Sequence, residues 1–249
     1  MIFRAALLSA CLLLLPAYAM AGEFDAKQRD EIGAIVRGYL LKNPEILLEI
    51  SKELEKRQQV AEDQQRGSSI AQHADEIFRS KADLVVGNPK GDVTIVEFFD
   101  YNCPWCKKSM PELQKLLKAD PNIRLVLKEF PILGEGSEYA AYAALASQSQ
   151  GKYWQFHQAL LAHEGKVSKD IVDEIAKDQG LDVAKLKADM GKPEFEATVK
   201  RNQALAQTLG INGTPGFVVG DKLIPGFVPG DNLAAAVKEI RDAGGCAVC

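Results

Sequence analysis

The sequence contains little cysteine and little histidine for its length. Among 249 residues there are five cysteines and three histidines, and the formal net charge is −4. Five cysteines are too few for a dense disulfide scaffold in a chain of this length, and a hydrophobic core must therefore stabilise the fold. The chain has neither a basic stripe nor a polybasic patch, which argues against a nucleic-acid partner and against binding to an anionic membrane surface.

Internal repeats and low-complexity tracts are also missing, but the N-terminus carries an apolar run. Arg4 precedes AALLSACLLLLPAYA, and AYA (17–19) or AMA (19–21) offers a small-x-small cleavage site. This pattern predicts a signal peptide over 1–21 and therefore a periplasmic protein. The run is too short to span a bilayer comfortably. A retained anchor is one alternative, and LSAC (8–11) leaves a lipoprotein as another.

Residues 22–80 form a segment with helical patterns of its own. Apolar residues recur at helical spacing, and Asn43-Pro44 predicts a cap and the first turn of a second helix. The stretch 51–66 is almost entirely polar and can bury little against its own chain. We interpret the segment as an oligomerisation arm that pairs with other subunits in a dimer or trimer. The reason is that successive apolar residues are alternately three and four positions apart, as in a coiled coil. The alternative is a solvated linker with a helical pair packed on the main domain.

The rest of the chain reads as one α/β sheet interrupted by helices. Strands are predicted in 83–101, 121–133 and 216–227, and VTIVEFF is continuously apolar, as a central buried strand would be. Between them lie helical stretches at 138–150, 152–164, 168–180 and 182–190, and a last helix follows at 230–244. The order is therefore β-α-β, a helical block, then β-β-α.

The motif Cys-Pro-Trp-Cys stands where the central strand passes into a helix. There Cys103 would meet unpaired N–H groups and the positive end of a helix dipole, which stabilise a thiolate. Cys106 lies one turn further on the same face, and Pro104 fits the first helical turn. We predict that Cys103 is an exposed nucleophile with a lowered pKa and that Cys106 is the resolving thiol of a dithiol–disulfide exchange. The alternatives are half of a four-cysteine zinc site and a merely structural disulfide.

Three stretches carry a family resemblance: VTIVEFFDYNCPWC, GNPKGD before it, and GINGTPGFVVGD (210–221) after the helical block. Together they resemble the DsbA-type thioredoxin-fold enzymes of bacterial envelopes, over about 85–240 of this chain. The resemblance implies a thioredoxin-like domain (81–136 and 210–243), an inserted helical domain (137–209) and a cysteine-containing tail (244–249). The N-terminal arm resembles that of the ScsC and Com1-like branch, in which such arms join subunits.

The resemblance also implies roles for single residues. Thr214-Pro215 would be a loop with a cis proline that holds the substrate backbone beside Cys103. Glu97 matches an acidic residue beneath the disulfide that would shuttle a proton for Cys106. The alternative for Glu97 is a side chain that faces outward, and alternation does not decide between the two because Val96 and Phe98 flank Glu97 equally.

The residues between the two cysteines complete the predicted substrate-binding set, which is Pro104, Trp105, Thr214 and Pro215. Strongly oxidising members of the family carry a histidine where this chain has Trp105. An indole has no charge with which to stabilise a thiolate. Trp105 would instead offer an exposed apolar platform to unfolded substrates.

A second Cys-x-x-Cys pair, Cys246 and Cys249, follows Gly244-Gly245 at the C-terminus. The glycines indicate a mobile approach. Three roles remain open for the pair: a local disulfide, a relay of electrons to the main site, or a soft-metal site for copper(I).

The resulting hypothesis is an exported thiol–disulfide oxidoreductase, with isomerase or reductase action favoured over oxidase action because of Trp105 and the arm. Its partners would be cysteine-containing exported proteins and a membrane redox partner that resets the site. No cofactor and no resident metal is expected. The rival hypothesis is a copper-handling or chaperone-like binding protein that uses its thiols to hold metal.

Overall fold

The structure is a computed structural model that describes residues 24–249, so the predicted signal peptide lies outside the described residues. By its internal contacts the chain divides into two units, Met1–Arg57 and Gln58–Cys249.

The described part of the first unit is helical. It contains α1 (Ala26–Lys42) and the beginning of α2 (Glu45–Gln72), and α1 buries none of its residues. Asn43 does not act as the predicted cap of the second helix. Its side-chain amide donates to the carbonyl oxygen of Tyr39 at 2.8 Å and so satisfies the end of α1 instead.

The second unit is built on a five-stranded sheet in the order β1-β3-β2-β4-β5. The strands are β1 (Leu84–Gly87), β2 (Val93–Phe99), β3 (Ile123–Glu129), β4 (Gly216–Val219) and β5 (Lys222–Pro225). Only β2 and β3 pair in parallel, and the other three pairings are antiparallel. Every residue of β2 is buried, which agrees with the prediction of a central strand.

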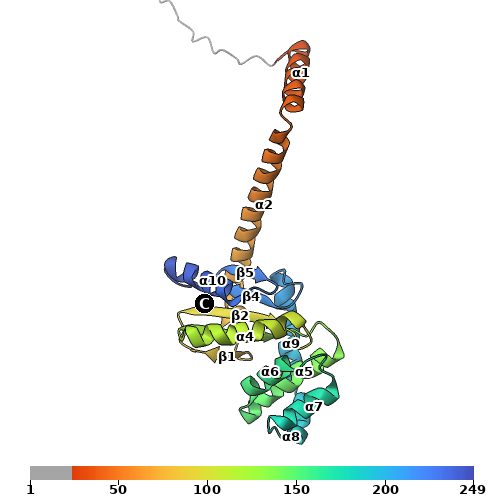
Figure 1. The fold of residues 1–249 in the computed structure, drawn as a ribbon, viewed down its shortest axis with the longest axis vertical. Helices are drawn as coiled ribbons and strands as arrows, with labels where there is room; N and C mark the ends of the chain where they lie inside the picture. The colour runs from red at the N-terminus through yellow and green to blue at the C-terminus, as the bar shows by residue number, and fades with distance from the viewer. Residues whose placement is uncertain (1–23) are drawn as a thin grey trace, which may run out of the picture. The chain divides into compact units, whose positions relative to one another are not determined.

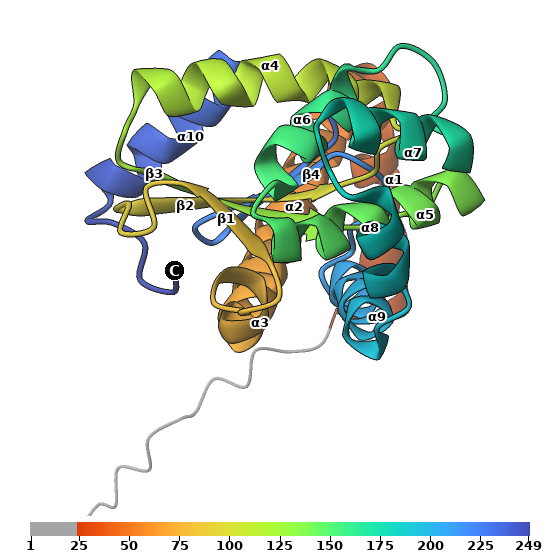
Figure 2. The ribbon, with the colours of Figure 1, turned by 90° about the horizontal axis from the view of Figure 1, so that it is seen from below.

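Helices cover both faces of this sheet. On one face lie α4 (Pro104–Ala119) and α10 (Gly230–Asp242), which contact each other. On the other face lie α3 (Ala74–Phe78) and α9 (Pro193–Thr208), which contact β2 and β3 respectively. Figure 2 shows these two pairs on opposite sides of the strands.

The inserted helices gather beside the sheet (Figure 1). They are α5 (Glu135–Ser147), α6 (Tyr153–Ala162), α7 (Lys169–Asp178) and α8 (Val183–Met190), with a short 3-10 helix at Gln148–Gln150. The sequence predicted these four α-helices. It did not predict α9, although α9 carries the chain back from this block toward β4.

Alternation along β2 assigns its side chains to two cores. Ile95 and Phe99 belong to the cluster that includes α4 and α10, whereas Val96 and Phe98 belong to the cluster on the opposite face. Successive side chains of a strand point to opposite faces, so Glu97 shares the face of Ile95 and Phe99. The outward-facing alternative for Glu97 is therefore wrong, because both faces of this strand are covered.

The C-terminal end of the segment interpreted as an arm lies in the core of the second unit. Ile70, Ala74, Ile77 and Phe78 expose at most 6% of their surface and pack in the cluster that contains Val96. Their helical spacing is satisfied by this chain's own sheet. These four residues are therefore not available to pair with another subunit.

Candidate active site

Cys103 occupies the N-cap position of α4, and Pro104 is the first helical residue. A proline at this position loses no helical hydrogen bond, because the first N–H groups of a helix have no partner within it. The cysteine backbone is extended, with φ −78° and ψ 117°. The local sequence thus places the sulfur at the end of a helix where unpaired N–H groups and the helix dipole favour negative charge.

The surroundings of Cys103 lower its pKa to about 6, chiefly through a hydrogen bond from the side chain of Cys106. The backbone N–H groups of Cys106 and Trp105 contribute in the same direction, while burial opposes it. The side chain of Thr214 also lowers the pKa, and in the thiol form Cys103 donates to the carbonyl oxygen of Thr214 at 3.0 Å. The donors prevail, so most of the sulfur is thiolate at neutral pH, and the thiolate is the nucleophile.

The prediction of an exposed Cys103 is wrong. The residue exposes only 4% of its surface, because its sulfur lies against the Thr214 carbonyl. Cys106 is completely buried, and both cysteines are free thiols. Burial raises the pKa of Cys106 far above its usual value, and its hydrogen bond to Cys103 adds to the effect. The two thiols therefore differ strongly in acidity, as a nucleophile and a resolving thiol require.

Glu97 lies in β2 and exposes 1% of its surface. Burial raises its pKa to about 8, with a smaller contribution from a negative charge on Cys103. A negative charge on Glu97 in turn raises the pKa of Cys106, so the two side chains influence each other's protonation. Its Oε1 atom has no hydrogen-bond partner among the described residues. The site thus contains a carboxyl group that can exchange a proton near neutral pH.

Asp100 is a central residue that the sequence analysis missed. Its buried carboxylate accepts hydrogen bonds from the N–H groups of Asn102 (2.7 Å), Ile132 (2.8 Å) and Leu133 (2.9 Å) and from the Ser137 hydroxyl (2.7 Å). It therefore holds together the turn before Cys103 and the loop after β3. An acidic residue directly after a buried strand was the signal that could have revealed it.

Asn102 attaches the same turn to the inserted helices. Its side chain accepts from the N–H of Val167 at 2.7 Å and donates to the Val167 carbonyl at 3.2 Å and to Ser137 Oγ at 3.1 Å. A side-chain amide that both donates and accepts fixes its partner segment in one register. The residue before Cys103 therefore links the sheet to the helical block.

A second buried group of polar residues lies behind this turn. Glu129 accepts hydrogen bonds from the hydroxyls of Tyr101 (3.0 Å) and Tyr153 (2.5 Å), and Nδ1 of His157 lies 3.0 Å from the Tyr101 hydroxyl. Burial raises the pKa of Glu129 well above its usual value and lowers that of His157 to about 3. His157 is therefore uncharged at neutral pH, and both groups form part of a hydrogen-bonded core.

The Thr214–Pro215 loop lies beside Cys103, and its peptide bond is cis, as the resemblance implied. The Pro215 carbonyl accepts a hydrogen bond from the Gly226 N–H at 2.9 Å, which ties this loop to the turn after β5. A groove runs along the loop, lined by residues 210–214, Gly216, Leu223, Pro225 and Gly226. The structure therefore brings together Cys103, Thr214 and Pro215.

Exposed apolar side chains lie in the segments that follow β2 and β3. Trp105 is 54% exposed, Ile132 41% and Leu133 50%, and Pro104 is also exposed. Because β2 and β3 run parallel, the segments that follow them meet at the same edge of the sheet. The site therefore has a reactive centre with an apolar, solvent-facing rim.

The tail cysteines are joined as a Cys246–Cys249 disulfide. Just before the tail, Arg241 binds Asp120, the C-cap residue of α4, at 2.5 Å. The 16 residues of α4 separate that end from Cys103 by about 24 Å at 1.5 Å per residue. The structure therefore shows the local disulfide and does not bring the two cysteine pairs together.

The four-cysteine zinc site is not formed, because Cys246 and Cys249 are bonded to each other and Cys103 and Cys106 lie elsewhere as free thiols. Within residues 24–249, no three His, Cys, Asp or Glu side chains gather in a way that could hold a metal ion. Across the same range, no helix is both long and apolar enough to cross a bilayer.

Comparison with known families decides the classification. Residues 94–238 match the family described as DSBA-like thioredoxin domain. The chain belongs to this family. Residues 28–61 match a second family, described as Copper resistance protein ScsC N-terminal domain. The predicted thioredoxin fold and the predicted resemblance to the ScsC-like branch are both confirmed.

Two solved structures illustrate the relationship. A thioredoxin-like oxidoreductase from Silicibacter pomeroyi DSS-3 is 54% identical, covers 68% of this chain and 97% of its own, and has a TM-score of 0.67. Proteus mirabilis ScsC in a transitional conformation is 31% identical, covers 87% of this chain and 96% of its own, and has a TM-score of 0.65. The ScsC likeness thus extends well beyond the thioredoxin-like domain.

Among curated proteins, Disulfide bond formation protein D of Bacillus subtilis (strain 168) is 28% identical over 156 residues, which is 58% of this chain and 70% of that protein. Na(+)/H(+) antiporter NhaA 1 of Salinispora arenicola (strain CNS-205) is 30% identical over 157 residues. The matched segment spans only 24% of the antiporter's length. That similarity is therefore confined to a part of the antiporter.

Proposed function

We propose that this protein is an exported thiol–disulfide oxidoreductase that acts on cysteine-containing proteins. The observation that carries the proposal is the Cys103 thiol, whose pKa falls to about 6, placed beside the Thr214–Pro215 loop and above a buried, weakly acidic Cys106. Thiol exchange needs one sulfur that is ionised beside the substrate-binding loop, and a second that reacts later. A relative from Bordetella parapertussis bears the name Thiol:disulfide interchange protein DsbA.

In the reducing direction, the Cys103 thiolate attacks one sulfur of a substrate disulfide, and the other substrate sulfur leaves as a thiolate. The Cys106 thiol then loses its proton and attacks the Cys103 sulfur, which releases the second substrate thiolate. Two electrons pass to the substrate, and the enzyme is left with a Cys103–Cys106 disulfide. In the oxidising direction the same steps run backwards.

Glu97 is the group that we assign to the proton of Cys106. The buried Cys106 thiol needs a base when it attacks, and water has little access to it. With a pKa of about 8, Glu97 can accept that proton and return it in the reverse step. Thr214 and Pro215 are assigned to binding the substrate backbone beside Cys103.

We favour isomerase or reductase action over oxidase action. Trp105 supplies no positive charge to the thiolate, unlike the histidine of strongly oxidising relatives. The exposed apolar rim at Trp105, Ile132 and Leu133 suits unfolded or misfolded chains, whose apolar residues are accessible. Several such sites in one assembly would favour the exchange of wrong disulfides for right ones.

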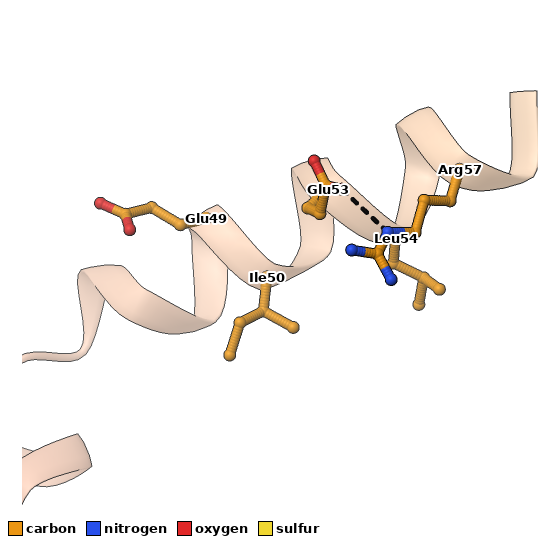
Figure 3. Close-up of a pocket in the computed structure, with 5 residues that line it drawn as sticks. All are labelled: Glu49, Ile50, Glu53, Leu54 and Arg57. Atoms are coloured by element: carbon orange, nitrogen blue, oxygen red, sulfur yellow. Dashed lines mark hydrogen bonds and ion pairs between the residues drawn. The ribbon is translucent and has the colours of Figure 1, made fainter. Parts of the chain in front are cut away.

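The arm is the segment that we assign to assembly. Many large apolar side chains of α1 and of the beginning of α2 are exposed: Ile32, Ile35, Val36, Tyr39, Leu41, Leu47, Leu48, Ile50 and Leu54. On α2, Ile50 and Leu54 project from the same side of the helix (Figure 3) and line a shallow groove with Glu49, Glu53 and Arg57. An apolar stripe flanked by charges is the surface of a helix that pairs with others. We infer a dimer or trimer.

Export and resetting complete the proposal. The N-terminal sequence supports a cleaved signal peptide, and a solved relative that is 30% identical is described as a periplasmic thioredoxin-like protein from Salmonella enterica serovar Typhimurium. Repeated turnover needs a partner that restores the dithiol or the disulfide. We assign this task to a membrane redox protein.

A copper-handling role is the second candidate, because residues 28–61 match a domain described by copper resistance. Replacing Cys246 and Cys249 with serine separates the two roles. Loss of copper(I) binding with intact thiol exchange would show that the tail has a binding role of its own. Redox activity that depends only on Cys103 and Cys106 would support the enzyme.

The deciding experiment is reactivation of a scrambled-disulfide protein by the mature protein with its active site reduced. We expect reactivation that is lost in Cys103→Ser and retained when both tail cysteines are replaced by serine. Reduction of a simple disulfide without reactivation would contradict the isomerase preference and leave a reductase. No exchange in either assay would contradict the proposed enzyme.

A further inference from the structure

Three side chains beside the thiol pair form a small aromatic and cationic surface. The rings of Trp105 and Phe227 are stacked, with centroids 5.7 Å apart and planes inclined by 27°. The Lys108 ammonium lies 5.3 Å from the centroid of the Trp105 ring and 4.8 Å from that of Phe227. We call these three residues the aromatic platform. Sequence analysis considered only Trp105.

The backbone holds the platform between the two segments assigned to catalysis and substrate binding. Trp105 and Lys108 belong to the first turns of α4, next to Cys103. Phe227 follows Gly226, whose φ of +76° is a conformation that glycine adopts readily and other residues rarely do. The Gly226 N–H donates to the Pro215 carbonyl at 2.9 Å, which fixes this turn to the cis-proline loop. A substrate between Cys103 and that loop therefore passes the platform.

The chemistry of the platform indicates what it binds. Trp105 leaves 54% of its surface in solvent, although indole groups gain free energy by contact with apolar and aromatic groups. The Lys108 ammonium lies over two rings. Because Lys108 is exposed, its ammonium remains available to a carboxylate of a partner. An aromatic face next to a cation complements an apolar side chain next to an acidic one.

We propose that the aromatic platform selects substrates by the residues that flank their reacting cysteine. A large apolar or aromatic side chain packs on Trp105 and Phe227, and a neighbouring Asp or Glu pairs with Lys108. An extended substrate chain advances about 3.4 Å per residue. Side chains one or two positions from the substrate cysteine can therefore reach Trp105, which is two residues from Cys103. This proposal rests on the thiol–disulfide exchange proposed above.

The test uses short peptides, each joined to an identical copy by a disulfide. One peptide carries Phe and Glu beside its cysteine, a second Phe and Lys, and a third Ser and Gln. In a Cys106→Ser background, the Cys103 thiolate attacks one of the two identical sulfurs, forms a mixed disulfide and releases the other peptide as a thiolate. Acid quenching and mass spectrometry give the second-order rate constant. All rates are measured at pH 8, and the ratios between peptides for one variant do not depend on the ionised fraction of its Cys103.

We expect the Phe–Glu peptide to react about tenfold faster than the Ser–Gln peptide, in line with one aromatic contact and one ion pair at a binding surface. Phe227→Ala should remove most of this preference, and Phe227→Leu should retain part of it. Lys108→Glu should make the Phe–Lys peptide react faster than the Phe–Glu peptide.

Lys115→Glu is the matched control, because Lys115 is exposed on the same helix two turns further on. It should keep the order of the three peptides. If the ratios of the three peptide rates are the same in Phe227→Ala, in Lys108→Glu and in the parent protein, the proposed role of the platform is overturned, whereas thiol exchange is not. Absence of any mixed disulfide at Cys103 would overturn the proposed function and the platform with it.

Discussion

At the residue scale, the site depends on two cysteines whose pKa values shift in opposite directions. Hydrogen bonds to the Cys103 thiolate lower its pKa, and burial raises that of Cys106. Sequence spacing predicted this division of roles, because the first cysteine of the motif falls at a helix N-terminus. It did not predict that Cys103 would be buried, since the covering Thr214 lies far away in the sequence.

Alkylation of the reduced protein should therefore follow the ionisation of Cys103. We expect the rate with iodoacetamide to rise with a midpoint near pH 6, against 9.0 for an ordinary cysteine, and the label to lie on Cys103 alone. Replacing Cys106 with alanine removes the main donor to the thiolate, so the midpoint should move upward. A midpoint near 9, or equal labelling of both thiols, would contradict this assignment.

The raised pKa of Glu97 leads to a prediction about the pH dependence of stability. Its pKa is about 8 in the folded protein against an ordinary 4.5, so between these values the unfolded chain has released a proton that the folded protein keeps. Stability therefore falls as pH rises through this range, by about 1.4 kcal/mol per pH unit. Glutamine does not titrate, so Glu97→Gln should exceed the parent protein in stability at pH 8.

Urea unfolding of both reduced proteins at pH 5 and pH 8 checks this prediction. The stability advantage of Glu97→Gln should be small at pH 5 and several-fold larger at pH 8. The same variant should slow the step in which Cys106 attacks. If the free energies of unfolding of the two proteins change with pH in parallel, Glu97 does not titrate in this range.

At the element scale, strands and most helices could be predicted because apolar residues recur with a clear period. The helix α9 was missed because two of its buried residues are polar. Thr198 donates to the Glu194 carbonyl at 2.7 Å, and Asn202 donates to the Glu129 carbonyl at 3.1 Å. Buried polar groups with local or strand partners interrupt the apolar pattern that sequence analysis relies on.

The turn before α4 also depends on buried polar contacts, which makes Asp100→Asn informative. Asparagine keeps one carbonyl oxygen but replaces the other oxygen by an NH₂ group. Two of the four donors that surround Asp100 then lose their acceptor. An unsatisfied buried donor costs about 1–3 kcal/mol, so we expect a loss of about 2–6 kcal/mol in the free energy of unfolding.

Urea unfolding at neutral pH measures that loss. Asp231→Asn is a suitable control, because Asp231 is an exposed acidic residue at the start of α10. It should change the free energy of unfolding by less than about 0.5 kcal/mol. A loss in Asp100→Asn no greater than that of the control would show that the loop after β3 is held in another way.

At the scale of the whole molecule, sequence periodicity could not say where the arm ends. Apolar residues at helical spacing occur before the polar stretch 51–66 and again from Ile70 to Ile77, and the spacing is the same whether the partner is another chain or the chain's own sheet. Only the packing separates them: Ile70 and Ile77 are buried, whereas Ile50 is 56% exposed. The identity of a packing partner is a property of the three-dimensional arrangement and is not encoded in the period.

The tail disulfide should contribute to stability without contributing to exchange. Its Cys249 end packs on the cluster that contains Ile70, and the neighbouring Val248 carbonyl accepts from Arg79 at 2.7 Å. Closing so short a loop lowers the conformational entropy of the unfolded chain, which stabilises the folded protein by about 2 kcal/mol. Replacing Cys246 and Cys249 with serine should lower the free energy of unfolding by about that amount, measured in urea without reductant. A simultaneous loss of peptide-disulfide reduction would contradict a purely structural tail.

The arm carries the last prediction, because exposed apolar residues on α2 gain free energy only if another surface covers them. Replacing Ile50 and Leu54 with glutamate would place two charges in the proposed interface, where burying an unpaired charge is strongly unfavourable. We expect this double variant to be a monomer by analytical ultracentrifugation at concentrations at which the parent protein is a dimer or trimer.

A charge change outside the groove provides the control for this variant. Lys56 is exposed on the same helix and does not line the groove with Ile50 and Leu54, so Lys56→Glu should leave the assembly intact. The monomeric variant should still reduce simple peptide disulfides, because its thiol pair lies outside the arm, but it should reactivate scrambled proteins poorly. If it sediments like the parent protein, another surface assembles the subunits. If it is a monomer with full reactivation, assembly is not what favours isomerisation.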